Sequence, residues 1–356
     1  MSKSISDTIY ELRFPLTVLI ILPHIPFLYK SDNSLLISIV NELFQQGICR
    51  IAVPTFFFIS GYLFFKQLKK WDTSTYISKI KKRCKTLALP YMIWNTIPII
   101  LLILTHSKLF VYDYMEDHGW WRVFWDCNRY GYVPKYNFLS IEMYNSKPIN
   151  FPFWYIRDLC VVMILSPIIW SFITRARMFG IVLLGIAMIL NLWIPFEGFS
   201  INAFFYFTLG AFMRIYEIDF LAFCKRWEFH SYIFSFIILL LKLYLSLNGH
   251  NAIVYNICHQ IFALTGMVVV INITQRIKWK INDTLVQSSF FMYAMHALIA
   301  SRLVKLTGKI IMPTSDVTSI TLHLITTIST ILLCVMTYLV LKKAFPKFLF
   351  FINGGR

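Results

Sequence analysis

The sequence has 356 residues, of which 58% are apolar and only 14% are charged, and its mean hydropathy is +0.63. A soluble domain carries about a quarter charged residues and roughly half apolar ones, so this composition excludes an ordinary soluble protein. The net charge of +17 would suit a nucleic-acid-binding protein, but basic residues in a membrane protein usually fix its topology. We therefore predict a protein of the lipid bilayer with no nucleic-acid partner.

Apolar runs recur along the chain with the length of about 20 residues that is needed to cross a hydrocarbon core of about 30 Å. Because a spanning backbone must satisfy its own hydrogen bonds, these runs are predicted helices. The predicted spans are 14–30, 48–66, 87–105, 153–172, 178–196, 201–216, 230–248, 252–274, 287–305 and 318–341. The predicted fold class is all-α, a polytopic transmembrane bundle of about ten helices that forms a single integral-membrane domain over residues 1–356.

The distribution of basic residues predicts the orientation of these spans. With a cytoplasmic N-terminus, 22 of the 34 Lys and Arg residues fall in inside segments, which favours N-in and C-in. Two connecting segments are long: a basic loop at 67–86, predicted to be cytoplasmic, and a large loop at 106–152, predicted to be external. We therefore expect a multi-pass membrane protein.

The large external loop is rich in aromatic and charged side chains. They are Trp120, Trp121, Trp125, Tyr130, Tyr132, Asp113, Glu116, Asp117, His118 and Asp126. Trp and Tyr favour the membrane interface, so the loop could be a lid that lies on it. The aromatic faces could also pack on sugar rings while the carboxylates bind hydroxyls. The two interpretations are compatible.

Metal and familiar soluble-enzyme motifs are missing from the sequence. The seven cysteines are scattered and contain no CxxC pair, and no HExxH occurs, so we predict neither a metal site nor a disulfide framework. There is also no GxSxG, Walker or Rossmann pattern. Any donor molecule must therefore be held by helix ends, basic loops and a cavity.

Arg13 and His24 form the sharpest ionisable pair, because ionisable groups in membrane spans are costly and are functional candidates. Eleven helical steps of about 100° bring both side chains to within roughly 20° of one face, about 16 Å apart along the axis. Pro23 removes a backbone donor and is expected to bend the helix beside His24. A buried imidazole there is a candidate general base; the simpler interpretation is a histidine that bonds a neighbouring carbonyl.

Two further charged groups border the spans. A basic stretch with Lys82, Arg83 and Lys85 precedes the third span. It is either a topology anchor or a clamp for a polyphosphate donor, since Lys and Arg bind phosphates by charge and forked hydrogen bonds. Arg157 and Asp158 enter the fourth span side by side, and we expect them mainly to pair with groups on other helices and hold the bundle together.

Polar faces on the late spans predict a polar cavity inside the bundle. Side chains at helical spacing occur in the eighth and ninth spans: Asn256, His259 and Gln260, then Ser289, Tyr293 and His296. Lys242 lies within the seventh span, and its long stem could snorkel to an interface.

Several of these landmarks resemble the membrane acyltransferase-3 family, which includes bacterial O-acetyltransferases of surface glycans. The matching segments are the Arg13/His24 spacing, Val53–Leu63 with Ser60, Lys81–Trp94, Phe153–Leu159 with Trp154, Phe207–Phe212 and Ser289–His296. They follow the family's order and span most of the chain. One departure is Thr86, where many members carry a further Arg, so the donor clamp would be assembled differently here.

The resemblance implies a membrane-bound O-acyltransferase of the bacterial cytoplasmic (inner) membrane. Acetyl-CoA, the implied acyl donor, would dock on the cytoplasmic side near Arg13, Lys82, Arg83 and Lys85, and its thioester would reach toward His24. His24 would act as a base or as a transient acyl carrier. The cavity and its supports would comprise Ser60, Trp154, Arg157, Asp158, His259 and His296. The acceptor would be a hydroxyl of a surface glycan or of its lipid-linked saccharide precursor.

Two other classes of protein share part of this pattern. A multi-pass transporter or flippase for a glycan-related substrate would also have spans and a polar cavity, but the repeats that are common in transporters are not found. A membrane sensor or assembly partner would not need an Arg and a His on one face. Detection of acyl transfer would separate the enzyme from the first alternative, and binding of coenzyme A would count against the second.

Overall fold

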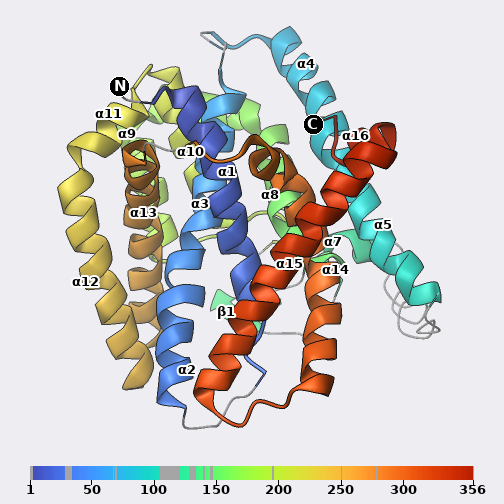
Figure 1. The fold of residues 1–356 in the computed structure, drawn as a ribbon. Coiled ribbons are helices and arrows are strands. Elements are labelled where there is room, and N and C mark those ends of the chain that lie inside the picture. The colour runs from blue at the N-terminus through green and yellow to red at the C-terminus, as the bar shows by residue number, and fades with distance from the viewer. Residues whose placement is uncertain are drawn as a thin grey trace.

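The computed structural model describes residues 3–28, 34–66, 68, 70–104, 121–127, 134–138, 141–144, 147–194, 196–249, 251–277 and 280–355. The chain forms a bundle of helices in which both termini, α4 and α16 lie at one end, and the α14–α15 connection lies at the other (Figure 1).

The N-terminal part of the bundle contains nine helical elements among the described residues. They are α1 (Ile5–Ile21), η1 (Leu22–His24), α2 (Leu35–Val40), η2 (Asn41–Gln45), η3 (Ile48–Ile51), α3 (Ala52–Phe64), α4 (Thr73–Arg83), η4 (Cys84–Ala88) and α5 (Leu89–Leu104). Of these, η1 and η3 are 3-10 turns and η2 and η4 are π-helical turns.

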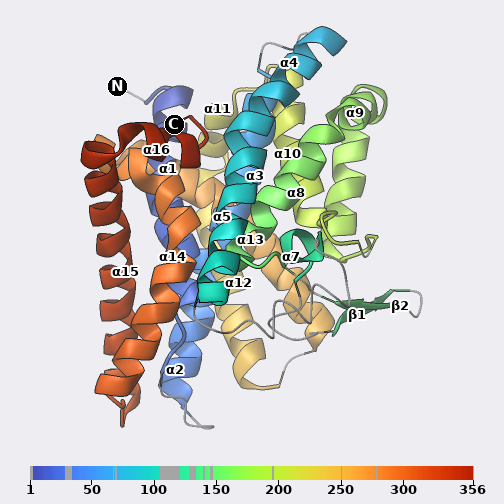
Figure 2. The same cartoon turned by 90° about the vertical axis from the view of Figure 1, so that its right-hand side faces the viewer.

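A β-hairpin separates this part from the remaining helices. The middle elements are α7 (Arg122–Trp125), β1 (Pro134–Phe138), β2 (Ile141–Tyr144), η5 (Phe151–Phe153), α8 (Trp154–Ile164), α9 (Ser166–Ile189) and α10 (Ile201–Ile215). The last are α11 (Phe220–Arg226), α12 (Glu228–Leu247), α13 (Ala252–Arg276), α14 (Asp283–Ile310), α15 (Asp316–Ala344) and α16 (Pro346–Ile352). The antiparallel hairpin lies at the flank of the bundle (Figure 2) and is the described exception to the predicted all-α class.

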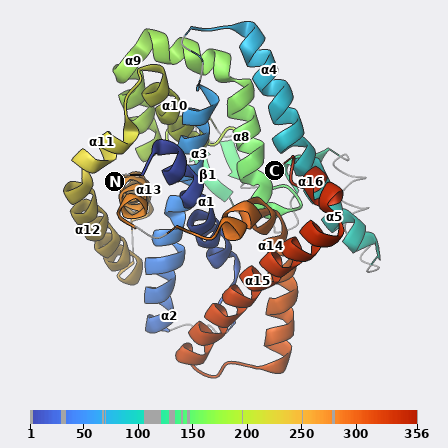
Figure 3. The same ribbon diagram turned by 45° about the horizontal axis from the view of Figure 1, so that its top comes forward.

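The first helix begins and ends earlier than the predicted span 14–30. Its N-terminus is set by Ser4, whose side chain accepts a hydrogen bond from the Asp7 backbone N–H. The α-helix ends at Ile21, and Pro23 lies in the 3-10 turn that follows and ends at His24; residues 29–30 lie outside the described part. Viewed from the end that carries the termini, α1 is central (Figure 3), and it contacts α3, α13, α14 and α15.

The second helical segment is longer than the predicted span 48–66, because helical structure begins at Leu35 and continues, with irregular turns, to Phe64. Polar residues such as Glu42 and Gln45 interrupt the apolar pattern there, which hid the segment from the sequence analysis. Gly47 makes the break between η2 and η3: a Cβ at this position would lie 2.3 Å from the Leu43 carbonyl oxygen. Around this irregular backbone Glu42, Gln45 and Cys49 are buried.

Two glycines allow α3 and α10 to cross closely. A Cβ on Gly61 would lie 2.0 Å from the Phe207 carbonyl oxygen, and a Cβ on Gly210 would lie 2.0 Å from the Phe58 carbonyl oxygen. Small residues permit such approaches between membrane helices, where packing rather than water exclusion drives association. This crossing fixes the wall of the bundle behind the site described below.

The predicted fourth and fifth spans correspond to α8 and a broken α9. Helix α8 ends at Ile164, and Pro167 opens the next helix. Helix α9 is interrupted at Arg177, whose φ of 48° and ψ of −135° are not helical. Among the described residues, six helical segments are long and apolar enough to cross a membrane. The count of ten spans and the orientation relative to the cytoplasm therefore stay predictions.

The two predicted loops contain ordered secondary structure. Most of the basic segment 67–86 is helical, because Asp72 caps α4 and π-helical η4 joins α4 to α5. In the external segment 106–152, the described residues include α7 and the hairpin. Of its aromatic and charged residues, the following lie outside the described residues: Asp113, Glu116, Asp117, His118, Trp120, Tyr130 and Tyr132.

Candidate functional site

A polar cavity with a volume of about 420 Å³ lies among α1, η3, α8, α13 and the α9–α10 connection. Its polar lining includes His24, Arg50, Lys147, Arg157, Asp158, Glu197, Asn256, His259 and Gln260. Aromatic side chains that include Trp154, Tyr155 and Trp193 complete the walls. The cavity therefore gathers side chains from segments far apart in sequence, as the polar faces of the late spans predicted.

His24 lies at the end of the central helix and faces this cavity. Its ring stacks on that of His296 at a centroid distance of 5.2 Å and an interplanar angle of 21°. The edge of Phe151 closes another side at 4.7 Å. The break in α1 at Pro23 thus places the imidazole between an aromatic wall and a second imidazole.

His296 is oriented by its own helix. Its Nδ1 lies 2.7 Å from the Tyr293 carbonyl oxygen and 3.2 Å from that of Met292. Because carbonyls only accept, Nδ1 carries the hydrogen, which leaves Nε2 as the basic nitrogen of the neutral ring. This Nε2 is buried and has no hydrogen-bond partner within the described structure. His296 can therefore hold a neutral ring against His24.

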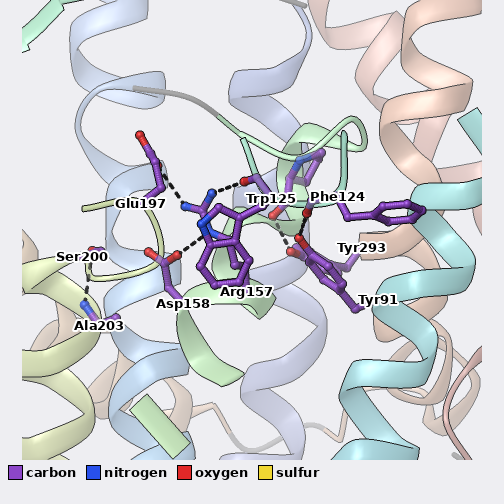
Figure 4. Close-up of polar contacts among 10 residues, drawn as sticks. Tyr91, Phe124, Trp125, Arg157, Asp158, Glu197, Ser200, Ala203 and Tyr293 are labelled. Atoms are coloured by element: carbon purple, nitrogen blue, oxygen red, sulfur yellow. Dashed lines mark hydrogen bonds and ion pairs between the residues drawn. The ribbon is translucent and has the colours of Figure 1, made fainter. Parts of the chain in front are cut away.

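Arg157 is held on three sides at another wall of the cavity (Figure 4). Its guanidinium lies 3.0 Å from Asp158 Oδ1 and 3.3 Å from Glu197 Oε2, and it donates to the Trp125 carbonyl oxygen at 2.5 Å. It also lies over the Trp125 ring at 5.5 Å. Arg157 therefore joins α8 to the end of α7 and to the α9–α10 connection.

The α9–α10 connection is fitted against the same tryptophan. Gly198 has a φ of +90°, and a Cβ there would lie 2.6 Å from the Trp125 ring. Only glycine meets both demands without strain. Nearby, the Trp193 indole donates to the Phe199 carbonyl oxygen at 2.7 Å. This part of the cavity is rigid, because backbone conformation and aromatic packing specify it together.

Asn150 joins the end of the segment 106–152 to the helices that carry the site. Its amide nitrogen donates to the carbonyl oxygens of Trp94 and Ala294, and its backbone N–H donates to Asn95 Oδ1. The Tyr293 hydroxyl donates to the Pro152 carbonyl oxygen at 2.5 Å, and Tyr91 donates to the Phe124 carbonyl oxygen. The sequence analysis missed Asn150, because a lone Asn before an apolar run carries no distinctive signal.

Lys242 is fully buried, so the expectation that it snorkels to an interface is wrong. Its Nζ lies 3.3 Å from Glu42 Oε1 and donates to the Gln46 carbonyl oxygen at 2.5 Å. The Tyr255 hydroxyl donates to the same Glu42 oxygen at 2.7 Å. Glu42 lies in the π-helical turn that was not predicted, which is why this buried ion pair behind the cavity was missed.

The structure gathers part of the predicted site and separates the rest. His24, Trp154, Arg157, Asp158 and His259 line the cavity, and His296 contacts it through His24. The other predicted residues do not line it; they are Arg13, Ser60, Lys82, Arg83 and Lys85. Ser60 lies on α3 next to the glycine crossing. The cavity also contains Arg50, Lys147 and Glu197, which the sequence analysis did not select.

Arg13 and His24 do not share one buried face. Arg13 is exposed, and its guanidinium lies 5.7 Å from the centre of the Tyr10 ring. The 3-10 turn at Leu22–His24 winds at about 120° per residue instead of about 100°, which rotates His24 roughly 60° further round the axis. Arg13 therefore lies in the middle of α1 and His24 in the turn that follows it, and the two side chains have different surroundings.

The basic residues of the third-span entry also divide. Lys82 and Lys85 are exposed, whereas Arg83 is half-buried and interacts electrostatically with Tyr155 and Cys160 of α8. This cluster lies at the end of the bundle that carries the termini (Figure 2).

Among the described residues, no group of three or more His, Cys, Asp or Glu side chains could hold a metal ion.

Comparison with known proteins agrees with this architecture. An acyltransferase domain model, Acyl_transf_3, matches residues 12–339. The chain belongs to the acyltransferase-3 family. The resemblance predicted from the ordered motifs is thereby confirmed, and the helices long enough to span a bilayer make the chain a multi-pass membrane member of it.

One curated relative adds a biological context. The chain is 23% identical over 180 residues to the succinoglycan biosynthesis protein ExoH of Rhizobium meliloti (strain 1021). The match covers 49% of this chain and 45% of that protein, so the chain spans about half the length of this relative. No solved structure matches the chain.

Proposed function

We propose that this protein transfers an acetyl group from cytoplasmic acetyl-CoA to a hydroxyl of a cell-surface polysaccharide or of its lipid-linked saccharide precursor. The family membership supports acyl transfer, and the similarity to a succinoglycan biosynthesis protein supports a glycan acceptor. The multi-pass helices support a location in the bacterial cytoplasmic (inner) membrane. The observation that carries the proposal is the imidazole of His24, which faces a polar cavity and stacks on His296.

His24 has two balanced chemical routes to this transfer. In the first, its basic nitrogen takes the proton of the acceptor hydroxyl, whose oxygen attacks the thioester carbonyl. The carbon–sulfur bond breaks, and His24 returns the proton to the leaving thiolate. In the second, the His24 nitrogen itself attacks the carbonyl, expels the thiolate and then passes the acyl group to the hydroxyl oxygen, while the hydroxyl proton goes to the thiolate. Stacking on His296 supports either route by fixing the ring.

The donor would bind at the end of the bundle that carries the termini. Lys82 and Lys85 present exposed cations there, while Arg83 turns inward. Arg13 starts the path along α1, and about 16 Å of helix separates it from His24. Coenzyme A supplies the acyl group as an activated thioester on a long flexible arm. The cavity does not reach Arg13, so the arm would enter between α1 and its neighbours.

The acceptor would enter the cavity on its other side. Trp154 and Trp193 line it, and aromatic faces of this kind can pack on sugar rings while amide side chains such as Asn256 and Gln260 bind hydroxyls. The buried Arg157 group supports the wall behind them. This arrangement separates donor and acceptor at the two ends of the path and joins them at His24.

Acyl transfer by a deletion strain that is complemented with variants tests the proposal. Incorporation of acetyl groups into surface glycan, measured by mass spectrometry and NMR, should fall by about 10²- to 10⁴-fold in His24→Ala. The matched control is His230→Ala, because His230 is exposed and outside the cavity; it should keep wild-type transfer.

Binding of acetyl-CoA separates the donor role from the chemical role. The melting temperature of purified wild type should rise with acetyl-CoA, because a ligand of the folded state stabilises it. The rise should disappear in Arg13→Ala and persist in His24→Ala. Full transfer by a well-folded His24→Ala variant would refute the assignment. Movement of a lipid-linked saccharide across the membrane without acyl transfer would establish the transporter alternative instead.

A further inference from the structure

Arg50 is a cation on the cavity wall that the chemistry of acyl transfer does not use. It lies in η3, and its backbone N–H donates to the Gly47 carbonyl oxygen at 2.9 Å. The break at Gly47 thus places Arg50 at the start of α3, where its side chain is exposed to the cavity. Arg50 and Lys147 both interact electrostatically with the His24 ring.

The guanidinium of Arg50 is positioned but not neutralised. Gln46 Oε1 accepts from its Nε at 3.2 Å and from its Nη2 at 2.6 Å. An amide carries no charge, so these bonds orient the fork and leave its positive charge intact. Of the carboxylates that the structure describes, none lies within 4.0 Å of Arg50; the neighbouring Glu42 is paired with Lys242 and accepts from Tyr255.

A cation without a carboxylate partner is unusual inside a membrane protein, where the dielectric constant is low. Buried charges are normally paired, because taking an ion out of water is costly. Arg50 avoids part of this cost through the cavity, and its remaining donors point to a ligand that supplies negative oxygens. Arg binds carboxylate and phosphate groups in forked geometry, and Lys147 on the same wall adds a second positive charge.

We propose that Arg50, oriented by Gln46 and assisted by Lys147, binds an anionic group, a carboxylate or a phosphate, on the acceptor saccharide beside the hydroxyl served by His24. The inference rests on the proposed function, because it takes the cavity as the acceptor site. It assigns the protein an acidic rather than a neutral acceptor, and it makes Arg50 a specificity-determining residue. An acidic sugar supplies the carboxylate, and a phosphorylated sugar supplies the phosphate.

Binding of simple sugars to the full-length protein in nanodiscs tests this inference. The probes are D-glucuronate, D-glucose 6-phosphate and neutral D-glucose, with affinities taken from thermal-shift titrations. Wild type should bind at least one anionic sugar more tightly than glucose. In Arg50→Gln that anionic sugar should bind about 10- to 100-fold more weakly, because a charged hydrogen bond is lost, while glucose binding should stay unchanged.

Two further variants keep the test interpretable. Arg50→Lys retains the charge without the fork and should keep an intermediate affinity. Arg302→Gln removes the same charge from an exposed position outside the cavity and should behave as wild type. Folding of each variant is checked by its melting temperature without ligand.

Each outcome has a defined meaning. Preference for glucuronate identifies a carboxylate, and preference for the sugar phosphate identifies a phosphate; either supports the subsite if Arg50→Gln removes it. Equal binding of all three sugars, no binding of any, or an unchanged preference in Arg50→Gln overturns it. Loss of acetyl-CoA binding in Arg50→Gln also overturns it, because Arg50 would then serve the donor. Absence of acyl transfer in wild type, with Arg50-dependent anion binding retained, refutes the proposed function alone.

Discussion

Arg157 and Arg50 lie on walls of one cavity, yet the protein treats their charges in opposite ways. Arg157 is buried and has Asp158, Glu197 and the Trp125 carbonyl oxygen as partners. Arg50 is exposed to the cavity, and its hydrogen-bond partner is the neutral Gln46 amide. The charge of Arg157 is therefore balanced by carboxylates of the protein, whereas the charge of Arg50 is left for a ligand to balance.

This difference separates residues that support the cavity from residues that are available to a ligand. The removal of one partner from a buried ionic group lowers stability mainly because the other partner then remains buried and unpaired. A cation that has no carboxylate partner, such as Arg50, can be removed with little loss in the free energy of unfolding. The Lys242–Glu42 pair is of the same kind as the Arg157 group, because its two side chains are buried and form an ion pair.

The largest effect is expected at the Lys242–Glu42 pair. Glu42→Gln leaves the Lys242 ammonium without its counter-ion and should lower the free energy of unfolding by about 3–5 kcal/mol. Adding Lys242→Met to Glu42→Gln should recover most of this loss, because both charges are then gone. SDS-induced unfolding in mixed micelles measures Glu42→Gln, Lys242→Met and the double variant; simple addition of the two single losses would show that the two side chains do not act as a buried ion pair.

A smaller effect contrasts the two cavity arginines directly. Asp158→Ala removes one charged partner of Arg157 but leaves Glu197 and the Trp125 carbonyl oxygen, so we expect a loss of about 1.5–3 kcal/mol in the free energy of unfolding. Arg50→Gln should change the same quantity by no more than about 0.5 kcal/mol. Equal destabilisation by the two substitutions would abolish the distinction between a supporting cation and an available one.

Much of the fold could be predicted, because helices that span a membrane appear in the sequence as long stretches of high hydropathy. Each predicted span overlaps a helical element, and the reading of 153–172 and 178–196 as separate spans matches the interruption at Arg177. The misplaced boundaries have specific causes. Span 14–30 was placed too late because the polar cap at Ser4 precedes the apolar run, and Leu35–Phe64 was shortened because Glu42 and Gln45 lie inside a helical segment.

The candidate site was predictable where polar residues share helical spacing within an apolar run. His259 and His296 were found in this way, whereas His24 was selected as an ionisable group within a span; the structure places all three in or beside the cavity. Arg50 and Glu197 were missed because they lie at irregular turns, where no periodicity reports which way a side chain faces. The shared face of Arg13 and His24 failed for the same reason, because three residues of 3-10 geometry altered the angle.

The smallest effect is expected at an exposed carboxylate that has hydrogen-bond donors rather than a buried cation. Asp72 caps α4 by accepting from the Thr75 backbone N–H at 2.9 Å and the Ser74 hydroxyl at 2.8 Å, and the Thr75 hydroxyl also donates to it. These bonds, the Thr75 hydroxyl first, lower the pKa of Asp72 from its ordinary 3.8 to about 2.

A depressed folded-state pKa means that this cap stabilises the protein above about pH 4 and that its contribution is lost as the pH falls toward about 2. Asp72→Asn keeps a capping oxygen but does not titrate. The melting temperature of wild type minus that of Asp72→Asn should therefore be constant from pH 7 to pH 4 and then fall, while acid effects elsewhere cancel. A difference that stays constant down to pH 2 would mean that the Asp72 carboxylate gains nothing from its donors. The Asp72 cap would then differ from the buried ionic groups of Arg157 and Lys242, because water could replace its hydrogen bonds without a loss of stability.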